Sequence, residues 1–356
     1  MRVVAVHLLN DYSGSPKVLM QLLKSWTKNH KETHLFTCSG RIGFLSNIAD
    51  VKEHFFWYKF AKNPLLRLLF LITSQFILGT KLLFFLKKSD VLYVNTVLPF
   101  GAAIAGKMRG CKVIYHIHET SVKPKILKDF LFGVSKTTAE KVVYVSQFLA
   151  EKEPIVPNYE IVYNVLESDF VEQAKPYRKI EKPEKIVLMV CSLKAYKGVD
   201  QFLKLANLNP EYTFKLVVNA SQEEINAYFV NENFPTNFQV FPTQKDTQPF
   251  YREASVVLNL SDINLWVETF GLTVLEGMTY GLPAIVPPIG GITELVDNYR
   301  NGFRINSIDI NRISDHLHHL LDKNEVYAIM SNHAIQKSEL FSEKYFEQQS
   351  LEIISN

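Results

Sequence analysis

Apolar and polar residues alternate over the first 166 positions in a pattern that predicts short buried strands separated by helices. The strands are nearly continuous apolar runs, which is typical of a parallel sheet covered on both faces. We expect strands at Val3–Leu8, His34–Thr37, His54–Tyr58, Val91–Asn95, Val113–His118, Val142–Ser146 and Ile161–Tyr163. Helical periodicity fills the intervals at Lys17–Lys28, Leu65–Lys87 and Phe100–Met108.

The same alternation resumes after a polar segment from Glu167 to Glu184, which carries Pro176, Pro183 and mixed charge, as linkers do. Further strands are expected at Ile186–Cys191, Phe214–Asn219, Gln239–Phe241, Val256–Leu260, Ala284–Val286 and Phe303–Ile305. The pattern predicts an α/β chain with two doubly wound domains. We assign residues 1–168 to an N-terminal Rossmann-like domain, 169–184 to a linker, 185–338 to a C-terminal Rossmann-like domain and 339–356 to a terminal helix.

Composition agrees with this picture and excludes some partners. The 356 residues are 47% hydrophobic and 21% charged, which fits two globular domains rather than long disorder. A net charge of +3 is too small to indicate nucleic acid as a partner. The three cysteines lie far apart without CxxC spacing, and the N-terminus lacks a signal peptide, so we expect reduced thiols and a cytoplasmic location.

One segment, Leu65–Leu86, is as apolar and as long as a membrane span. Arg67 and Lys81 interrupt it, and basic residues are rare inside spanning helices. Three interpretations stay open: a spanning helix, a long buried core helix, or a helix lying on the inner face of the membrane with its basic residues against anionic headgroups.

The most informative segment runs from Glu268 to Glu276 and places two carboxylates around a turn of small residues. Phe270, Gly271 and Leu272 form that turn, and helical periodicity begins after Gly271. The free N–H groups of a helix start attract phosphate, whereas flanking acids suit hydroxyl groups. A ligand with phosphate in the middle and polyols at both ends is a nucleotide sugar.

These residues resemble the donor-site signature of glycosyltransferase family 4 (group 1), a retaining, metal-independent family. The motif continues with Gly281-Leu282-Pro283 and Gly290-Gly291-Ile292-Thr293-Glu294. The resemblance implies the GT-B fold, in which the active site lies in the cleft between two Rossmann-like domains and the last helix crosses back to the first domain. It also implies a nucleotide-sugar donor and no cofactor.

A second candidate site is His116-Ile117-His118-Glu119 at the carboxyl end of a predicted strand, where ligand-binding residues of parallel sheets collect. His-x-His is also a common metal-ligand pair, so a metal site and a packed strand-end histidine remain as alternatives. By resemblance, His118 contacts the donor sugar.

Other elements of the resemblance are partial. Lys197-Gly198 matches the family's phosphate-binding lysine, but Ser192 stands where the family has arginine, and Lys194 is the nearest cation that could replace it. Gly14, in the turn after the first strand, is the one glycine kept where the family usually has two. Glu276 is expected to hold ribose hydroxyls and Glu268 sugar hydroxyls.

The sequence therefore predicts a retaining hexosyltransferase that uses a nucleotide-diphosphate sugar and a glycan or lipid-linked acceptor, as in bacterial surface polysaccharide or lipopolysaccharide synthesis. Peripheral contact with an anionic membrane is part of this expectation. A nucleotide-sugar epimerase of the same fold and a non-catalytic scaffold remain as alternatives. A Rossmann oxidoreductase is disfavoured, because no Gly-x-Gly-x-x-Gly follows a predicted strand.

Overall fold

The chain folds into two compact units, described from a computed structural model that covers residues 1–178 and 184–355. The first unit comprises Met1–Asn164 together with the residues from Lys344 onward, and the second comprises Val165–Glu343. Each unit has its own parallel sheet and its own buried core.

The first unit contains a seven-stranded parallel sheet in the order β3-β2-β1-β4-β5-β6-β7. The inner strands of this sheet are almost continuously apolar, which explains why the pattern of the sequence located them. At the two edges, the expected strands His54–Tyr58 and Ile161–Tyr163 overlap the observed strands Val51–Phe56 and Tyr159–Ile161 only in part. The strands are β1 (Arg2–Val6), β2 (Glu32–Cys38), β3 (Val51–Phe56), β4 (Val91–Asn95), β5 (Lys112–Ile117), β6 (Lys141–Tyr144) and β7 (Tyr159–Ile161).

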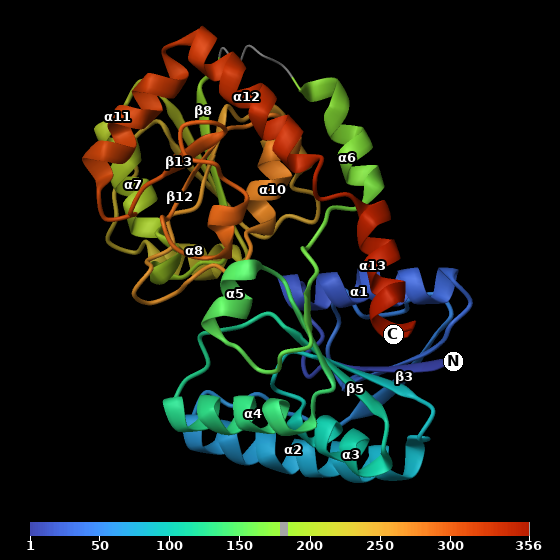
Figure 1. The fold of residues 1–356 in the computed structure, drawn as a ribbon. Helices are drawn as coiled ribbons and strands as arrows, with labels where there is room; N and C mark the ends of the chain where they lie inside the picture. Colours follow the sequence, from blue (N-terminus) through green and yellow to red (C-terminus); the bar gives the residue numbers. More distant parts are fainter. Residues whose placement is uncertain (179–183, 356) are drawn as a thin grey trace. The chain divides into compact units, whose positions relative to one another are not determined.

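Helices cover both faces of this sheet. Figure 1 shows α2 (Pro64–Phe85), α3 (Phe100–Arg109) and α4 (Lys125–Thr138) on one face, whereas α1 (Gly14–Lys28) and α13 (Glu343–Ser355) lie on the other. The terminal helix α13 is held on α1, because the Trp26 indole N–H donates to the Ser350 carbonyl oxygen at 3.2 Å. The short α5 (Gln147–Lys152) follows β6.

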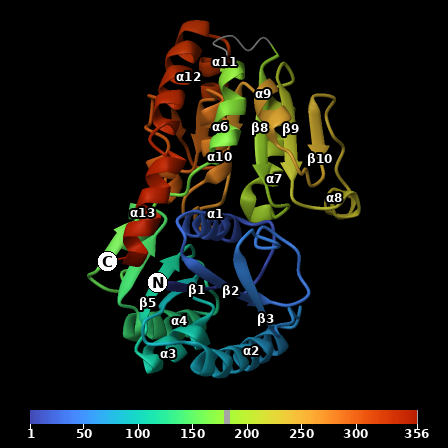
Figure 2. The same ribbon diagram turned by 90° about the vertical axis from the view of Figure 1, so that its right-hand side faces the viewer.

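The second unit contains a six-stranded parallel sheet in the order β10-β9-β8-β11-β12-β13. Figure 2 shows β10, β9 and β8 of this sheet side by side. Its strands are β8 (Ile186–Cys191), β9 (Thr213–Val218), β10 (Phe238–Phe241), β11 (Val256–Leu258), β12 (Ala284–Val286) and β13 (Gly302–Arg304). Its helices are α6 (Ser168–Ala174), η1 (Lys175–Tyr177), η2 (Ala195–Lys197), α7 (Val199–Leu208), α8 (Gln222–Tyr228), α9 (Gln248–Glu253), α10 (Leu272–Thr279), η3 (Gly291–Glu294), α11 (Ile310–Leu321) and α12 (Asn324–Ser338).

Both sheets are doubly wound, as predicted. The order of the strands reverses between β1 and β4 in the first unit and between β8 and β11 in the second. In open parallel sheets, ligands bind beyond the carboxyl ends of the strands at such a reversal. The topology alone therefore directs attention to the loops after β1, β4, β8 and β11.

Two predictions need correction. Part of the expected linker is a packed helix, α6, in which Phe170 lies edge-on to Tyr280 with ring centroids 5.9 Å apart; residues 179–183 of that linker lie outside the described residues. The interpretation of Leu65–Leu86 as a buried core helix is also wrong. Among the described residues, α2 is the helix long and apolar enough to cross a membrane, yet only 28% of its most apolar window is buried.

Candidate active site

The second unit brings two predicted residues into direct contact. The Lys197 ammonium forms an ion pair with the Glu268 carboxylate, and both side chains are largely shielded, at 14% and 16% exposed. Gly198 makes this approach feasible, since its φ is +83° and a Cβ there would lie 2.2 Å from the Leu260 carbonyl oxygen. The loops after β8 and β11 therefore meet where the topology predicts a site.

Polar groups of the β11 loop hold the Glu268 carboxylate. The Ser261 hydroxyl donates to Glu268 Oε1 at 2.9 Å, and the Asn259 amide donates to the same oxygen at 3.4 Å. Burial acts to raise the pKa of Glu268, but the Lys197 ammonium and these hydrogen bonds outweigh it and leave the pKa below its ordinary value. Glu268 is therefore an ionised, fixed carboxylate.

An aromatic pair lies beside this ion pair. The Lys197 ammonium is 4.7 Å from the centre of the Trp266 ring, which in turn stacks on Tyr196 at 5.3 Å. A cation over an indole face is attracted by the ring quadrupole, so Trp266 helps to hold the lysine. The Trp266 Nε1–H is buried and has no hydrogen-bond partner within the described part of the chain.

The glycine motifs fix the loop that carries Glu268. Gly271 is the residue before α10, with φ +109°, and a Cβ there would lie 2.7 Å from the Ile292 side chain. Gly290, with φ +120°, packs so closely that a Cβ would lie 2.5 Å from the Glu268 carbonyl oxygen. The Gly291 N–H donates to that same oxygen at 2.8 Å. The Gly-Gly motif is thus a support for the Glu268 loop.

Glu276 occupies a different environment from Glu268. It lies within α10, is 7% exposed, and accepts a hydrogen bond from the buried Tyr251 hydroxyl at 2.8 Å. Burial raises the pKa of Tyr251 well above its ordinary value, and the neighbouring Glu276 carboxylate adds to that effect. Tyr251 is therefore a neutral donor that orients this carboxylate.

The remaining predicted residues of the second unit differ in how well they are fixed. Phe270 is buried against Phe341, and Leu272 is the first residue of α10. Lys194 is exposed and makes no side-chain ion pair with any described residue. The Lys197 N–H donates to the Lys194 carbonyl oxygen at 2.9 Å, so the backbone of this loop is ordered, but that contact does not fix the Lys194 ammonium.

The first unit contains a separate polar cluster around His118. The His118 Nε2–H donates to the Asn95 amide oxygen at 2.8 Å, and the Asn95 amide nitrogen donates to His7 Nδ1 at 3.0 Å and to the Ser15 carbonyl oxygen at 3.2 Å. The Gly14 turn at the start of α1 is thereby tied to His118 through Asn95. His7 and His118 lie just beyond β1 and β5, and Asn95 is the last residue of β4.

Burial keeps the histidines of this cluster neutral. It lowers the pKa of His7 to about 4 and of His116 to about 3, and it lowers that of His118 well below the ordinary value. Glu119, whose carboxyl accepts the Val97 N–H at 2.9 Å, has its pKa raised to about 7 by burial. At neutral pH the His118 ring is therefore an uncharged hydrogen-bonding group.

Among the described residues, no third metal ligand accompanies His116 and His118. The His116 Nδ1 is bonded to the Tyr93 hydroxyl at 2.9 Å, and the two imidazole centroids lie 4.2 Å apart. Over residues 1–178 and 184–355, no group of three or more His, Cys, Asp or Glu side chains is arranged to hold a metal ion.

Comparison with known proteins identifies the second unit. The model of the family "Glycosyl transferases group 1" matches residues 171–337, which include Lys197, Glu268 and the Gly290-Gly291 support. The second unit therefore resembles group 1 glycosyltransferases over most of its length. This agrees with the resemblance that the Glu268–Glu276 motif shows.

Two curated relatives of the chain carry related names. An uncharacterized glycosyltransferase of Haemophilus influenzae is 28% identical over 59% of the chain and 58% of its own length. The N-acetyl-alpha-D-glucosaminyl L-malate synthase of Bacillus anthracis is 25% identical over 69% of the chain and 68% of its own length. The matched segment thus spans about six tenths to two thirds of these relatives.

The fold of the chain is also that of solved glycosyltransferases. The crystal structure of HepE from Anabaena in complex with UDP has a TM-score of 0.80 at 17% identity and covers 100% of both chains. The prediction of the GT-B fold is therefore confirmed.

Sequence reasoning missed several residues that build these sites. Asn95 is the last residue of one predicted strand and His7 the last but one of another, so the rule that selected the strand-end His118 could have selected them too. Ser261 and Asn259 likewise follow β11. Tyr251 carried no signal, because its contact with Glu276 depends on the packing of α9 against α10.

Proposed function

We propose that this glycosyltransferase moves a hexose-type sugar from a nucleoside diphosphate donor to a glycan or lipid-linked saccharide, with retention of configuration and without a metal. The observation that carries the proposal is the shielded Lys197–Glu268 pair beside the Gly271 helix start. An ammonium, free helix N–H groups and an ionised carboxylate are the groups that a sugar diphosphate needs.

Lys197 has two roles in this proposal. Without donor it neutralises Glu268, which offsets the cost of holding a carboxylate at 16% exposure. With donor, its ammonium also faces the diphosphate, where negative charge grows as the glycosidic bond breaks. Glu268 stays in place when the donor binds, because Ser261 and Asn259 continue to donate hydrogen bonds to it.

The two carboxylates divide the polyols of the donor between them. Glu268 would bind hydroxyls of the sugar, and Glu276, oriented by the neutral Tyr251 hydroxyl, would bind the ribose. No residue is assigned as a covalent nucleophile. In keeping with the family resemblance, attack comes from the face of the departing phosphate, which takes the acceptor proton.

His118 and Gly14 belong to the first unit, to which we assign sugar contact and the acceptor. A neutral imidazole held by Asn95 offers hydrogen bonding to hydroxyl groups without carrying charge. HepE, which shares the fold, is described as a complex with UDP and, in another crystal, with UDP-glucose. The UDP and UDP-glucose complexes of HepE support a uridine donor as the first choice to test.

The test is a panel of UDP-, GDP- and other activated sugars, read by thermal shift and by product analysis with saccharide acceptors. We expect one nucleotide sugar to raise the melting temperature and to yield a new glycoside with the anomeric configuration of the donor. A free sugar isomer without glycoside would indicate the epimerase, and an inverted linkage would overturn retention. Because Ser192 stands where the family has arginine, we expect this chain to bind diphosphate more weakly than family members that carry the arginine.

A further inference from the structure

The outer face of α2 is apolar although it does not pack against the core. Eight large apolar side chains of this helix are exposed, among them Phe84 at 88%, Leu65 at 79% and Phe76 at 76%. In contrast, the residues that α2 buries include the polar Ser74 and Gln75, which are 0% and 1% exposed. A helix that is apolar all round is normally buried, so this one lacks a covering partner within its unit.

The exposed residues form a stripe with helical spacing. Leu65, Leu69, Ile72 and Phe76 follow one another at intervals of four, three and four, which places them on one face. The inward face is built for close approach to α3, because a Cβ on Gly101 would lie 2.1 Å from the Gln75 carbonyl oxygen. Tight packing of the opposite side of α2 against α3 therefore leaves the stripe exposed.

Neighbouring helices extend this surface. Figures 1 and 2 both show α2, α3 and α4 as one layer on the same face of the first sheet. On α3, Met108 is 69% exposed, and on α4, Ile126 and Phe130 are 83% and 49% exposed. We call this set, with the α2 stripe, the α2 surface. A layer of helices that exposes this many large apolar side chains is typical of an interaction site on a soluble protein.

The charge around the α2 surface is strongly one-sided. Residues 54–118 contain nine Lys or Arg and one acidic residue, Asp90, so their net charge is +8 whereas that of the whole chain is +3. Asp90 is 2% exposed and pairs with Arg2, so it does not offset the surface charge. Exposed basic residues lie beyond both ends of the stripe, at Lys59 and Lys62 before it and at Lys87 and Lys88 after it, and the exposed Arg67 lies within its span.

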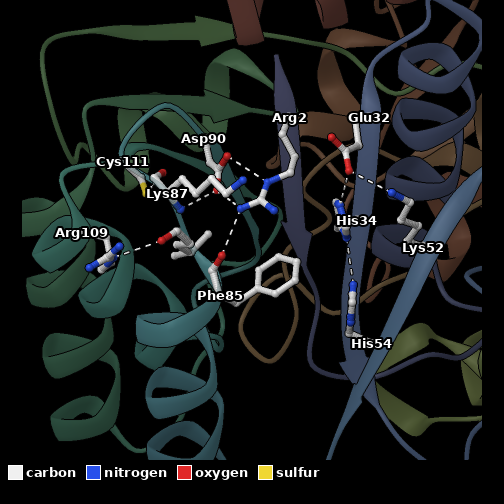
Figure 3. A network of polar contacts seen from close by, with 11 residues as sticks. Arg2, Glu32, His34, Lys52, His54, Phe85, Lys87, Asp90, Arg109 and Cys111 are labelled. Carbon is white, nitrogen blue, oxygen red and sulfur yellow. Dashed lines mark hydrogen bonds and ion pairs between the residues drawn. The ribbon is translucent and has the colours of Figure 1, made fainter.

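Polar contacts fix the carboxyl end of α2 to the sheet (Figure 3). Arg2 donates to the Phe85 carbonyl oxygen at 3.0 Å, and Arg109 donates to that of Leu86 at 3.1 Å. The Lys87 N–H donates to Asp90 Oδ2 at 2.7 Å. A helix anchored in this way and packed along α3 cannot leave its layer to cross a bilayer, so the spanning interpretation does not fit.

We propose that the α2 surface docks the enzyme onto an anionic lipid bilayer, with the stripe in the boundary between headgroups and acyl chains. An apolar stripe flanked by lysines is the combination that interfacial helices use. A second copy of the chain fits less well, because a two-fold contact would place the same basic residues against each other. Docking of this kind would hold the enzyme where a lipid-linked acceptor is found.

The test is sedimentation of the full-length protein with vesicles of phosphatidylglycerol and phosphatidylcholine, compared with phosphatidylcholine alone. We expect binding to the anionic vesicles that weakens as salt is added. The double variant Leu69→Ser and Phe76→Ser should bind at least about tenfold more weakly. Each of Lys62→Gln, Lys87→Gln and Lys88→Gln should cost up to about fivefold.

The matched control is Val230→Ser and Ile308→Ser, which removes apolar residues that are 73% and 67% exposed in the second unit and should leave vesicle binding unchanged. Equal thermal unfolding of both double variants shows that they remain folded. Absence of vesicle binding by the parent, or equal binding by the stripe variant, would overturn the proposal. A stable dimer in ultracentrifugation that the stripe variant dissociates would assign the surface to a second copy. These readouts need no donor, so they stand apart from the transferase activity.

Discussion

The polar clusters of the two units occupy equivalent places in their sheets but carry opposite chemistry. In the first unit, His118, Asn95 and His7 form a chain of neutral groups beyond the strands that flank the reversal of strand order. In the second unit, the equivalent loops hold an ion pair, Lys197 with Glu268. The doubly wound topology provides the place, and the side chains determine which part of a substrate each place can bind.

The difference follows from what each cluster does with buried charge. Burial without a counter-charge lowers the pKa of the histidines, so the first cluster stays neutral and suits hydroxyl groups. Lys197 keeps Glu268 ionised, so the second cluster has charge available for a diphosphate. Substitutions that remove the charge of the second cluster, or that alter the neutral groups of the first, therefore test this comparison most directly.

The largest effect is expected from Lys197→Met, which removes the cation from the charged cluster. Transfer should fall by about 10²- to 10³-fold, because a group that stabilises the leaving phosphate is lost. The Glu268 carboxylate would also be left shielded without a cation, at a cost of about 1–3 kcal/mol in stability. Rates of glycoside formation and urea unfolding measure the two effects.

Two control variants separate these effects. Lys194→Met removes an exposed lysine and should change transfer by less than about tenfold. The double variant Lys197→Met and Glu268→Gln should regain stability but not activity. Recovery of transfer in the double variant would show that Lys197 acts only by balancing Glu268.

A smaller effect is expected from Gly290→Ala, which leaves every charged group in place. Its Cβ would lie 2.5 Å from the Glu268 carbonyl oxygen, at a φ of +120° that favours glycine. Displacement of the Glu268 loop should lower transfer by about 10- to 100-fold. Gly133→Ala, where a Cβ meets nothing within 4 Å, is the matched control and should retain full activity.

The neutral cluster makes stability depend on pH. Its three histidines have lowered pKa values, so at the same pH the unfolded chain binds more protons than the folded chain. The free energy of unfolding therefore decreases as pH falls from about 6.5 toward about 4. The raised pKa of Glu119 acts in the opposite direction, since stability falls as pH rises toward about 7. Three histidines against one glutamate leave the unfolded chain with about two more bound protons than the folded chain, so stability should rise with pH in this window.

Urea unfolding between pH 4.5 and 6.5 measures this slope. His7→Asn should reduce it by about 1.4 kcal/mol per pH unit, and Glu119→Gln should increase it by a similar amount. The opposite signs distinguish titration of the cluster from general destabilisation. Unchanged slopes in both variants would contradict the neutral state assigned to these histidines.

The smallest effect is expected from Tyr251→Phe, which removes the hydrogen bond that orients Glu276. Affinity for the nucleotide should fall about fivefold while kcat changes little, because Glu276 is assigned to the ribose and not to the reacting centre. Tyr212→Phe, whose hydroxyl bonds to His318 and Asp322 instead, is the matched control. A fall in kcat with unchanged affinity would place Glu276 at the sugar instead.

The periodicity of the sequence predicted both sheets because their strands are buried on two faces and therefore read as apolar runs. It also predicted the start of α10, since Gly271 ends one pattern and Leu272 begins another. It could not predict that Lys197 pairs with Glu268, because that contact joins loops 71 positions apart.

The exposure of α2 could not be predicted for a related reason. Hydropathy measures how apolar a helix is and not which side the fold covers. In α2 the covered side includes Ser74 and Gln75. The pairing of Asn95 with His118 was within reach, since both follow strands of one sheet, but the order of those strands came only from the structure.

The central claim is that the second unit binds a nucleoside diphosphate through Lys197. Calorimetric titration of UDP and GDP into the parent, Lys197→Met and Lys194→Met measures it directly. We predict that the parent binds one diphosphate, that Lys197→Met weakens this binding by at least about tenfold and that Lys194→Met changes it far less. Equal affinity in the parent and a folded Lys197→Met variant would contradict the account.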